Sequence, residues 1–212
     1  GQPIAVPSQD MILGSYYLTK QKNNGVGEGK LFGSINEVLL AYENKVVELH
    51  ASIHLKNKDE WIKNTTVGRA IFNSILPDEM DYVNELIDKK RLTFIVNQCY
   101  LVVGNYKTVI FLDDLKELGF NMATNSGLSI SISDVLIPKE KENILSEAFD
   151  KVEDIKKKFD RHVLTEGERY NKVIDIWTHT TNHVAQVMED ELRKDSDGFN
   201  ALAMMTDSGA RG

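Results

Sequence analysis

The sequence predicts an α+β protein that is predominantly α, with a compact helical body, short strands and a projecting antiparallel coiled-coil hairpin. Most segments show apolar residues at helical spacing behind capping residues, and only brief stretches alternate polar with apolar residues. The charged sequence after Pro138 carries two narrow apolar seams, which are typical of a coiled coil. We expect three parts: the body over residues 1–133, the hairpin over 134–195 and a final segment over 196–212.

Two helices are expected near the start of the body. The run VPSQDMILGSYYLT places Ser8 where a good N-cap residue precedes a helix. The run SINEVLLAYENK gives Ser34 and Glu37 the spacing of a capping box, followed by an apolar stripe at helical intervals. The stretch between these helices is rich in glycine and asparagine and predicts a loop or tight turn.

The next segments mix strand and helix signals. The run VVELHASIHL alternates and predicts a strand. In NTTVGRAIFNSILP, Gly68 marks a turn or a close backbone approach, and Pro77 ends the element. Helices are expected in YVNELIDKK, LTFIVNQCYLVV and TVIFLDDLKELGF, with breaks at Gly104 and Gly119. The alternating run GLSISIS predicts a short strand.

The charged sequence after Pro138 predicts two long amphipathic helices. The apolar seam of the first helix consists of Ile144, Ala148, Val152, Ile155 and Phe159. The second helix begins with a capping box between Thr165 and Glu168. Its seam consists of Tyr170, Val173, Trp177, Val184 and Met188. Because a short polar turn joins these helices, we expect an antiparallel hairpin that projects from the body.

The composition argues against several classes of protein. A net charge of -7 disfavours broad non-specific contact with nucleic acid, which needs a dense basic face. Cys99 is the only cysteine, so we expect neither an internal disulfide nor a cysteine-based zinc site. The same observation predicts that the protein works in a reducing compartment. The sequence contains no signal-peptide pattern and no apolar run long enough to span a bilayer.

Motifs for catalysis are weak on the residues alone. Asp175, His179 and His183 share one helical face, but the glutamate of the H-E-x-x-H pattern is missing, so a polar face is the preferred interpretation. The run GVGEGK lacks the spacing of a phosphate loop. Arg69 and Arg211 each lie beside a glycine and could reach a phosphate, although a solvated arginine is the simpler interpretation. The residues therefore indicate a non-catalytic module without a metal site.

Several stretches together resemble one family. The runs PIAVPSQDMILGSYYLT, LHASI, TTVGRAIFN, ERYNKVIDIW and MMTDSGARG are similar, in order and from end to end, to the β′ subunit of bacterial DNA-directed RNA polymerase. The resemblance implies an internal fragment that lines the secondary channel, with a final segment leading back to the active-site region. This fragment would lie between the aspartates that hold the catalytic magnesium and the bridge helix. It would bind no cofactor and would be inactive alone. The Mg²⁺, and a Zn²⁺ elsewhere in the subunit, would belong to the intact nucleotidyltransferase.

The resemblance also implies site residues. Arg211 matches the arginine of SGARG that faces the nucleotide triphosphate or pyrophosphate, and Gln9 matches the glutamine of VPSQD near the same place. The hairpin resembles the coiled coil at the channel rim, where Asn171 and Lys172 would belong to a ppGpp or factor surface. The expected factor-docking tip consists of Asp160, Arg161, His162 and Glu166.

The implied partners are those of a transcribing polymerase in the cytoplasm, with no membrane. They are the remaining β′ and the β, α, ω and σ subunits, Gre-type secondary-channel factors, nucleotides, the RNA 3′ end and the DNA template. Without the resemblance, the alternative is a non-catalytic module that presents a helical hairpin to a protein partner. A zinc hydrolase is a third possibility and would require metal in the purified protein.

Overall fold

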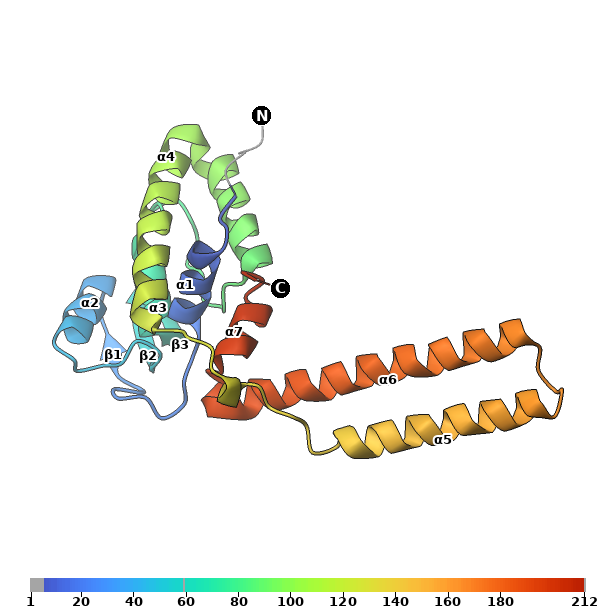
Figure 1. The fold of residues 1–212 in the computed structure, drawn as a ribbon. Helices are drawn as coiled ribbons and strands as arrows, with labels where there is room; N and C mark the ends of the chain where they lie inside the picture. The colour runs from blue at the N-terminus through green and yellow to red at the C-terminus, as the bar shows by residue number, and fades with distance from the viewer. Residues whose placement is uncertain (1–5, 59, 212) are drawn as a thin grey trace. The chain divides into compact units, whose positions relative to one another are not determined.

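The computed structural model, which describes residues 6–58 and 60–211, is predominantly helical with one three-stranded sheet, so the predicted fold class is confirmed (Figure 1). The chain divides into two compact units. The core unit comprises Gly1–Ser129 and Met204–Gly212, and the hairpin unit comprises Ile130–Ala203. None of the described helices combines the length and the apolar composition that crossing a bilayer requires.

The core unit contains four helices and the sheet in its first part. In chain order these are α1 (Asp10–Thr19), β1 (Leu31–Phe32), α2 (Ile35–Glu43), β2 (Ser52–Asn57), β3 (Glu60–Thr66), α3 (Val67–Ser74) and α4 (Lys89–Ser126). The hairpin unit contains the short 3-10 helices η1 (Ile132–Asp134) and η2 (Asp195–Gly198) with α5 (Lys141–Asp160) and α6 (Glu166–Lys194) between them. The last helix, α7 (Ala201–Asp207), begins in the hairpin unit and ends in the core unit.

The sheet has the strand order β1-β2-β3, with β1 parallel and β3 antiparallel to β2. The ladder between β2 and β3 shifts register between Ile53 and Leu55, and both of these side chains are fully buried. The strand predicted in VVELHASIHL is therefore confirmed for its second half. Its first half, residues 46–50, forms bends and turns instead.

The two arms of α4 hold α1 between them (Figure 1). Gly104 separates the arms with φ 74° and ψ −177°, a conformation that is essentially restricted to glycine. The prediction of a break at Gly104 is thus confirmed, whereas the break predicted at Gly119 is wrong because the helix continues to Ser126. Gly119 instead lies against α1, where an added Cβ would come within 2.9 Å of Met11 Cα.

The apolar core of the core unit joins α1, the sheet, α3 and α4. Its largest fully buried side chains include Ile12, Leu18, Ile53, Leu55, Phe72, Leu92, Ile95, Phe111 and Leu115. The rings of Phe72 and Phe111 meet edge to face, with centroids 6.5 Å apart. Cys99 is buried among these residues, and burial raises the pKa of its thiol. Its predicted role as a small buried apolar residue is confirmed.

The close backbone approach predicted at Gly68 is confirmed. Gly68 is the second residue of α3, and a Cβ added there would lie 1.8 Å from the carbonyl oxygen of Leu18 at the end of α1. The Gly68 amide donates to the carbonyl of Leu49 at 2.8 Å. Thr66 caps α3 by accepting a hydrogen bond from the Arg69 amide at 3.1 Å. The beginning of α3 is therefore fixed by its close contact with Leu18, the hydrogen bond to Leu49 and the cap at Thr66.

The helix predicted in YVNELIDKK is wrong for all but its last two residues. The side-chain amide of Asn73 pairs with the backbone of Val83, accepting from its N–H and donating to its carbonyl, both at 2.8 Å. These bonds occupy the groups that a helix would use. Helix α4 begins only after Asp88, whose carboxylate accepts from the Arg91 amide at 2.7 Å.

Two further local predictions near helix and strand ends are wrong. The run GLSISIS forms no strand, because it has no neighbouring strand to pair with and Ile132 is 95% exposed. The N-cap of α1 is Gln9, not Ser8, and its side chain makes no capping hydrogen bond. The Ser8 carbonyl instead accepts from the Met11 amide at 3.1 Å. By contrast, Ser34 caps α2 as predicted.

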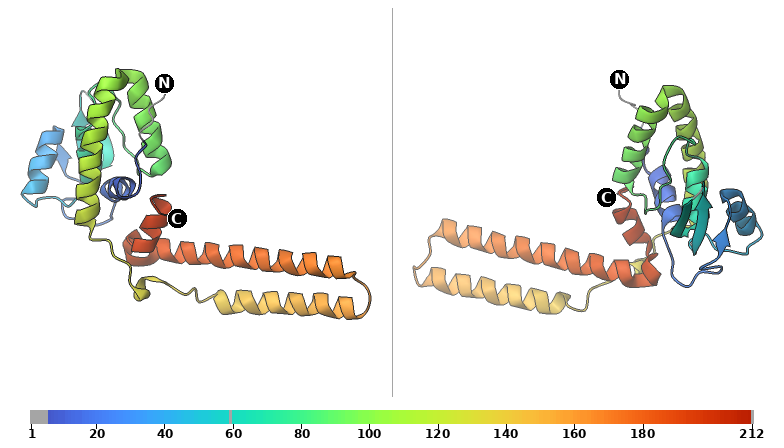
Figure 2. Two further views of the ribbon diagram at one scale, coloured as in Figure 1. Left: turned by 45° about the horizontal axis from the view of Figure 1, so that its top comes forward. Right: turned by 180° about the vertical axis from the view of Figure 1, so that it is seen from behind.

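Helices α5 and α6 lie side by side and antiparallel, as predicted (Figure 2). The predicted seam of α5 is the less exposed face of that helix, with Ala148 fully buried. In α6 the seam prediction is wrong for Tyr170, which is 60% exposed. Arg169 takes this place in the seam, four residues before Val173, and its guanidinium carbon lies 5.3 Å from the ring centre of Phe159.

Replacing Thr165 by alanine is expected to lower the free energy of unfolding of the hairpin unit by about 1 kcal/mol. The predicted capping box is confirmed: Thr165 Oγ1 accepts from the Glu168 amide at 3.3 Å, and Glu168 Oε2 accepts from the Thr165 amide at 2.8 Å. Urea denaturation followed by Trp177 fluorescence, in a Trp61→Phe background, measures the change.

The matched control for this cap is Thr178→Ala. Thr178 is exposed within α6 and caps nothing, so alanine there should leave the hairpin equally or more stable because of its higher helix propensity. Equal losses in Thr165→Ala and Thr178→Ala would show that the capping box is not the source of the stability.

Candidate functional site

Arg211 and the start of α1 meet in the core unit although they lie 201 positions apart in the sequence. Arg211 Nη2 is 3.3 Å from Asp10 Oδ1, and Asp10 follows Gln9, the N-cap of α1. The two side chains of the pair are 61% and 49% exposed, so the guanidinium stays accessible to solvent. The structure thus places Arg211 beside the residue that follows Gln9, and the nucleotide contact that the resemblance implies for Arg211 and Gln9 stays a prediction.

The loop that carries Arg211 is anchored at its base. The Lys89 amide donates to the carbonyl of the buried Ser208 at 3.0 Å, which ties the loop to the start of α4. Ser208 Oγ in turn accepts from the Ala210 amide at 3.2 Å, and Ala210 packs against the apolar core. Gly209 turns the chain at φ +69°. Gly212 lies outside the described residues.

A hollow of about 420 Å³ lies beside the Arg211–Asp10 pair. Its lining comprises Asp10, Leu13, Phe120, Ala123, Thr124, Leu128, Met205 and Arg211. The hollow combines apolar side chains with the hydroxyl of Thr124, one cation and one carboxylate. An anion could bind there by replacing Asp10 as the partner of Arg211, since a guanidinium makes forked, charge-assisted hydrogen bonds with phosphate or carboxylate oxygens.

Arg69 is half-buried and hydrogen-bonded to protein groups. Its Nε donates to the carbonyl of Thr19 at 3.1 Å, and its Nη1 donates to Asn84 Oδ1 at 3.2 Å. Burial lowers the pKa of the guanidinium from its ordinary value. Arg69 therefore joins α3 to the end of α1 through these hydrogen bonds, so it is not a simple solvated arginine.

The metal-like residues of α6 are arranged along a solvated face. Asp175, His179 and His183 are all exposed. Over residues 6–58 and 60–211, no three His, Cys, Asp or Glu side chains lie together in a way that could hold a metal ion. The described residues therefore do not fit the carboxylate cluster that a catalytic magnesium needs.

The tip of the hairpin, Asp160–Glu166, joins α5 to α6 within the hairpin unit. Asp160, Arg161 and His162 are exposed, and His162 turns the chain with φ 59°. Glu166 differs from them because Arg169 holds it in a two-pronged ion pair, in which Arg169 Nε donates to Glu166 Oε2 at 3.1 Å. This hydrogen bonding lowers the pKa of the Glu166 carboxyl. All four predicted tip residues are therefore exposed to solvent, and Glu166 differs only in that its carboxylate is paired with Arg169.

Sequence reasoning missed Arg169 at the base of the tip. It lies four residues after the cap Thr165 and three after Glu166, which is the spacing that brings side chains together on a helix. A shallow hollow of about 250 Å³ forms there, lined by Val152, Lys156, Phe159, Asp160, Glu166, Arg169 and Val173. Asn171 and Lys172 are exposed one turn further along α6, outside this hollow.

Comparison with known proteins matches the whole chain. The model of the family described as RNA polymerase Rpb1, domain 3, matches residues 1–135, and that of RNA polymerase Rpb1, domain 4, matches residues 164–212. The DNA-directed RNA polymerase subunit beta′ of Salinibacter ruber is 46% identical over 215 residues, which cover 100% of this chain and 15% of that protein. The subunit of the same description from Desulforudis audaxviator is 45% identical, with 100% and 18% covered. The chain thus spans less than a fifth of the length of these curated relatives.

Proposed function

The chain belongs to the RNA polymerase Rpb1 family as a fragment of a bacterial β′ subunit, and from this premise we propose that it forms part of the secondary channel of DNA-directed RNA polymerase. In this role it admits nucleotides during transcription and docks factors at the channel rim. The observation that supports the proposal best is the meeting of Arg211 with the start of α1, beside a hollow of suitable size for part of a nucleotide.

Arg211 is the residue that would meet the nucleotide. Its present partner Asp10 is about half exposed, and an ion pair of this kind contributes little because water screens it. A triphosphate or pyrophosphate carries more negative charge and more acceptor oxygens than one carboxylate, so it competes well for the guanidinium. Asp10 then serves to hold the side chain in position until the phosphate arrives.

The chemistry of bond formation would come from outside this chain. Magnesium, when bound to the intact enzyme, neutralises developing charge on the phosphates and lowers the pKa of the attacking hydroxyl. The described residues do not fit such a metal site, so this chain contributes positioning and electrostatics only. Without the rest of the polymerase it would make no RNA.

The hairpin would serve as a dock for Gre-type factors, through its tip. Asp160, Arg161 and His162 are exposed, and charged rims of this kind set the orientation and rate of association. Asn171 and Lys172 would extend this surface toward ppGpp. The remaining partners would be the rest of β′ with the β, α, ω and σ subunits, the RNA 3′ end and the DNA template, in the cytoplasm. A simple protein-binding module is the alternative, and the same exposed tip supports it.

In the intact polymerase, Arg211→Ala is expected to raise the KM for nucleotides by about tenfold, the loss typical of one hydrogen bond between charged groups. The rate at saturating nucleotide should change less, because the variant loses ground-state binding as well as transition-state binding. Arg211→Lys should restore the KM only in part, since an ammonium lacks the forked geometry. Single-nucleotide addition measured over a range of substrate concentrations provides the test.

The control for Arg211 is Asp10→Asn, which keeps the shape of the pair and removes the competing charge. It should leave the KM unchanged or lower it. Wild-type kinetics in Arg211→Ala would contradict the proposed role. A raised KM in Asp10→Asn would show that Asp10 has a part of its own in binding the nucleotide.

A further inference from the structure

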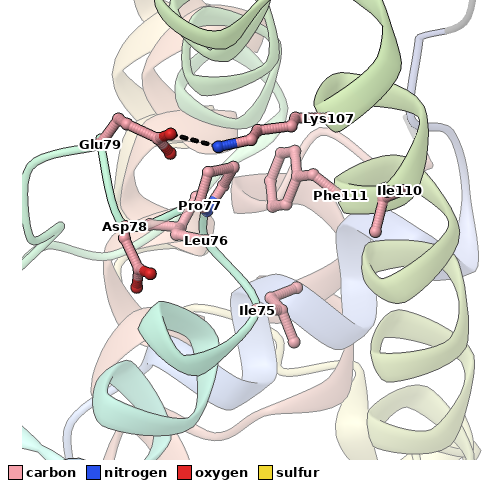
Figure 3. A pocket seen from close by; sticks show the side chains of 8 residues that line it. All are labelled: Ile75, Leu76, Pro77, Asp78, Glu79, Lys107, Ile110 and Phe111. Carbon is pink, nitrogen blue, oxygen red and sulfur yellow. Dashed lines mark hydrogen bonds and ion pairs between the residues drawn. The ribbon is translucent and has the colours of Figure 1, made fainter.

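A groove that the proposed function does not use runs along the core unit between residues 75–83 and α4. Its first hollow, of about 240 Å³, lies between Ile75–Glu79 and the α4 side chains Lys107, Ile110 and Phe111 (Figure 3). Its second hollow, of about 340 Å³, lies between residues 79–83 and the first arm of α4. Glu79 lines both hollows, so the hollows adjoin at this residue, and we refer to the two together as the groove.

The α4 side of this groove carries apolar side chains that are open to solvent, beside Arg91, Gln98 and Lys107. Phe94 is 49%, Val102 53% and Ile110 45% exposed, although each lines one of the two hollows. Three more apolar side chains of the same stretch of α4 are exposed but line neither hollow, namely Leu101, Tyr106 and Val109. A gathering of large apolar side chains on a surface is typical of an interaction site, because leaving it in water costs free energy that a partner could recover.

The opposite lip of the groove is acidic. It carries Asp78, Glu79 and Asp81, and Glu85 follows in the sequence without lining either hollow. Lys107 pairs with Glu79, and Arg91 Nη2 lies 2.6 Å from Glu85 Oε1. Asp78 and Asp81 are exposed and form no ion pair with any residue that the structure describes. The groove therefore offers an apolar wall together with two carboxylates that a cation could neutralise.

We propose that this groove binds a segment of the same polymerase subunit that lies outside this chain and carries both apolar side chains and lysine or arginine. The chain spans less than a fifth of its relatives' length, so a large part of the subunit is available to cover the apolar wall. A second copy of this chain is the poorer occupant, since its net charge is -7 and it would oppose an acidic lip. Nucleic acid is repelled for the same reason.

The proposal rests on the family assignment and not on the proposed channel role. Its first test places a photo-reactive benzophenone residue in place of Val102 in the intact polymerase, and the cross-linked peptide is identified by mass spectrometry. The expected product joins position 102 to a β′ segment outside this chain that contains apolar residues and at least one lysine or arginine. Cross-links to another subunit, to nucleic acid or to a second copy, or the absence of any cross-link, would overturn the proposal.

Charge variants test the acidic lip with the same cross-link. Asp81→Lys should lower the yield at position 102 by about threefold, since it replaces a partly screened attraction by repulsion. Asp81→Asn should lower the cross-linking yield less, and because position 81 is exposed, this change should not disturb the fold. The control Asp114→Lys makes the same charge change at an exposed α4 residue that does not line the groove, and it should keep the yield.

Equal yields for Asp81→Lys and Asp114→Lys would refute the role of the lip. Failure of the Arg211 experiment would leave the cross-linking result unaffected, because Arg211 lines a different hollow from those of the groove. The two proposals can therefore fail separately.

Discussion

Replacing Gly68 by alanine is expected to lower the free energy of unfolding of the core unit by about 3 kcal/mol, the upper range for overpacking a well-packed interior. The new Cβ would lie 1.8 Å from the carbonyl oxygen of Leu18, far inside van der Waals contact. The two atoms nearest to the new Cβ are the backbone oxygen and carbon of the Leu18 carbonyl, so this contact cannot be relieved by rotating a side chain. Helices α1 and α3 would have to separate, which would also strain the hydrogen bond between Arg69 and Thr19.

The matched control for Gly68 is Gly167→Ala. Gly167 lies in the first turn of α6, and a Cβ added there meets no atom within 4 Å. Alanine should therefore stabilise the hairpin unit by up to about 1 kcal/mol, through higher helix propensity and a less flexible unfolded chain. Urea denaturation followed by circular dichroism measures both variants. A loss below about 1 kcal/mol for Gly68→Ala would mean that the close contact relaxes easily.

Reversing Asp160 and Glu166 to lysine in the intact polymerase is expected to reduce factor-stimulated transcript cleavage by about tenfold at a limiting factor concentration, because repulsion at a charged rim slows association. Basal RNA synthesis should stay close to wild type, since the tip is proposed to act only in docking. Asp160 ends α5, where a cation is more favourable than an anion, so Asp160→Lys should not weaken the helix. Cleavage of a stalled transcript, measured against factor concentration, gives the result.

The single variants separate docking from structure, because Glu166 also pairs with Arg169. Asp160→Lys alone changes only an exposed charge, so it should account for much of the effect. Reversing Glu147 and Asp150, which are exposed in the middle of α5, provides a matched control that should retain cleavage. Normal cleavage in the double tip variant would exclude this tip as the dock. Loss of basal synthesis as well would show that the tip residues are structural.

The sequence by itself determined the features that depend on neighbours along the chain. The cap at Ser34, the capping box at Thr165 and the break at Gly104 were predictable because each uses groups within a few residues. The seam of the hairpin was predictable from periodicity for the same reason. Only Tyr170 was assigned wrongly, because Arg169 covers Phe159 with its long side chain and takes the inner position.

The tertiary structure decided the features that need a partner far away in the sequence. Residues 82–88 look helical, but Asn73 takes the backbone groups of Val83 and prevents a helix there. The run GLSISIS alternates like a strand and finds no strand to pair with. The pairing of Arg211 with Asp10 likewise depends on how 201 intervening positions fold. Periodicity reports which face of a segment is apolar, whereas hydrogen-bond and ion partners across such distances are chosen only when the packed chain brings them within a few ångströms.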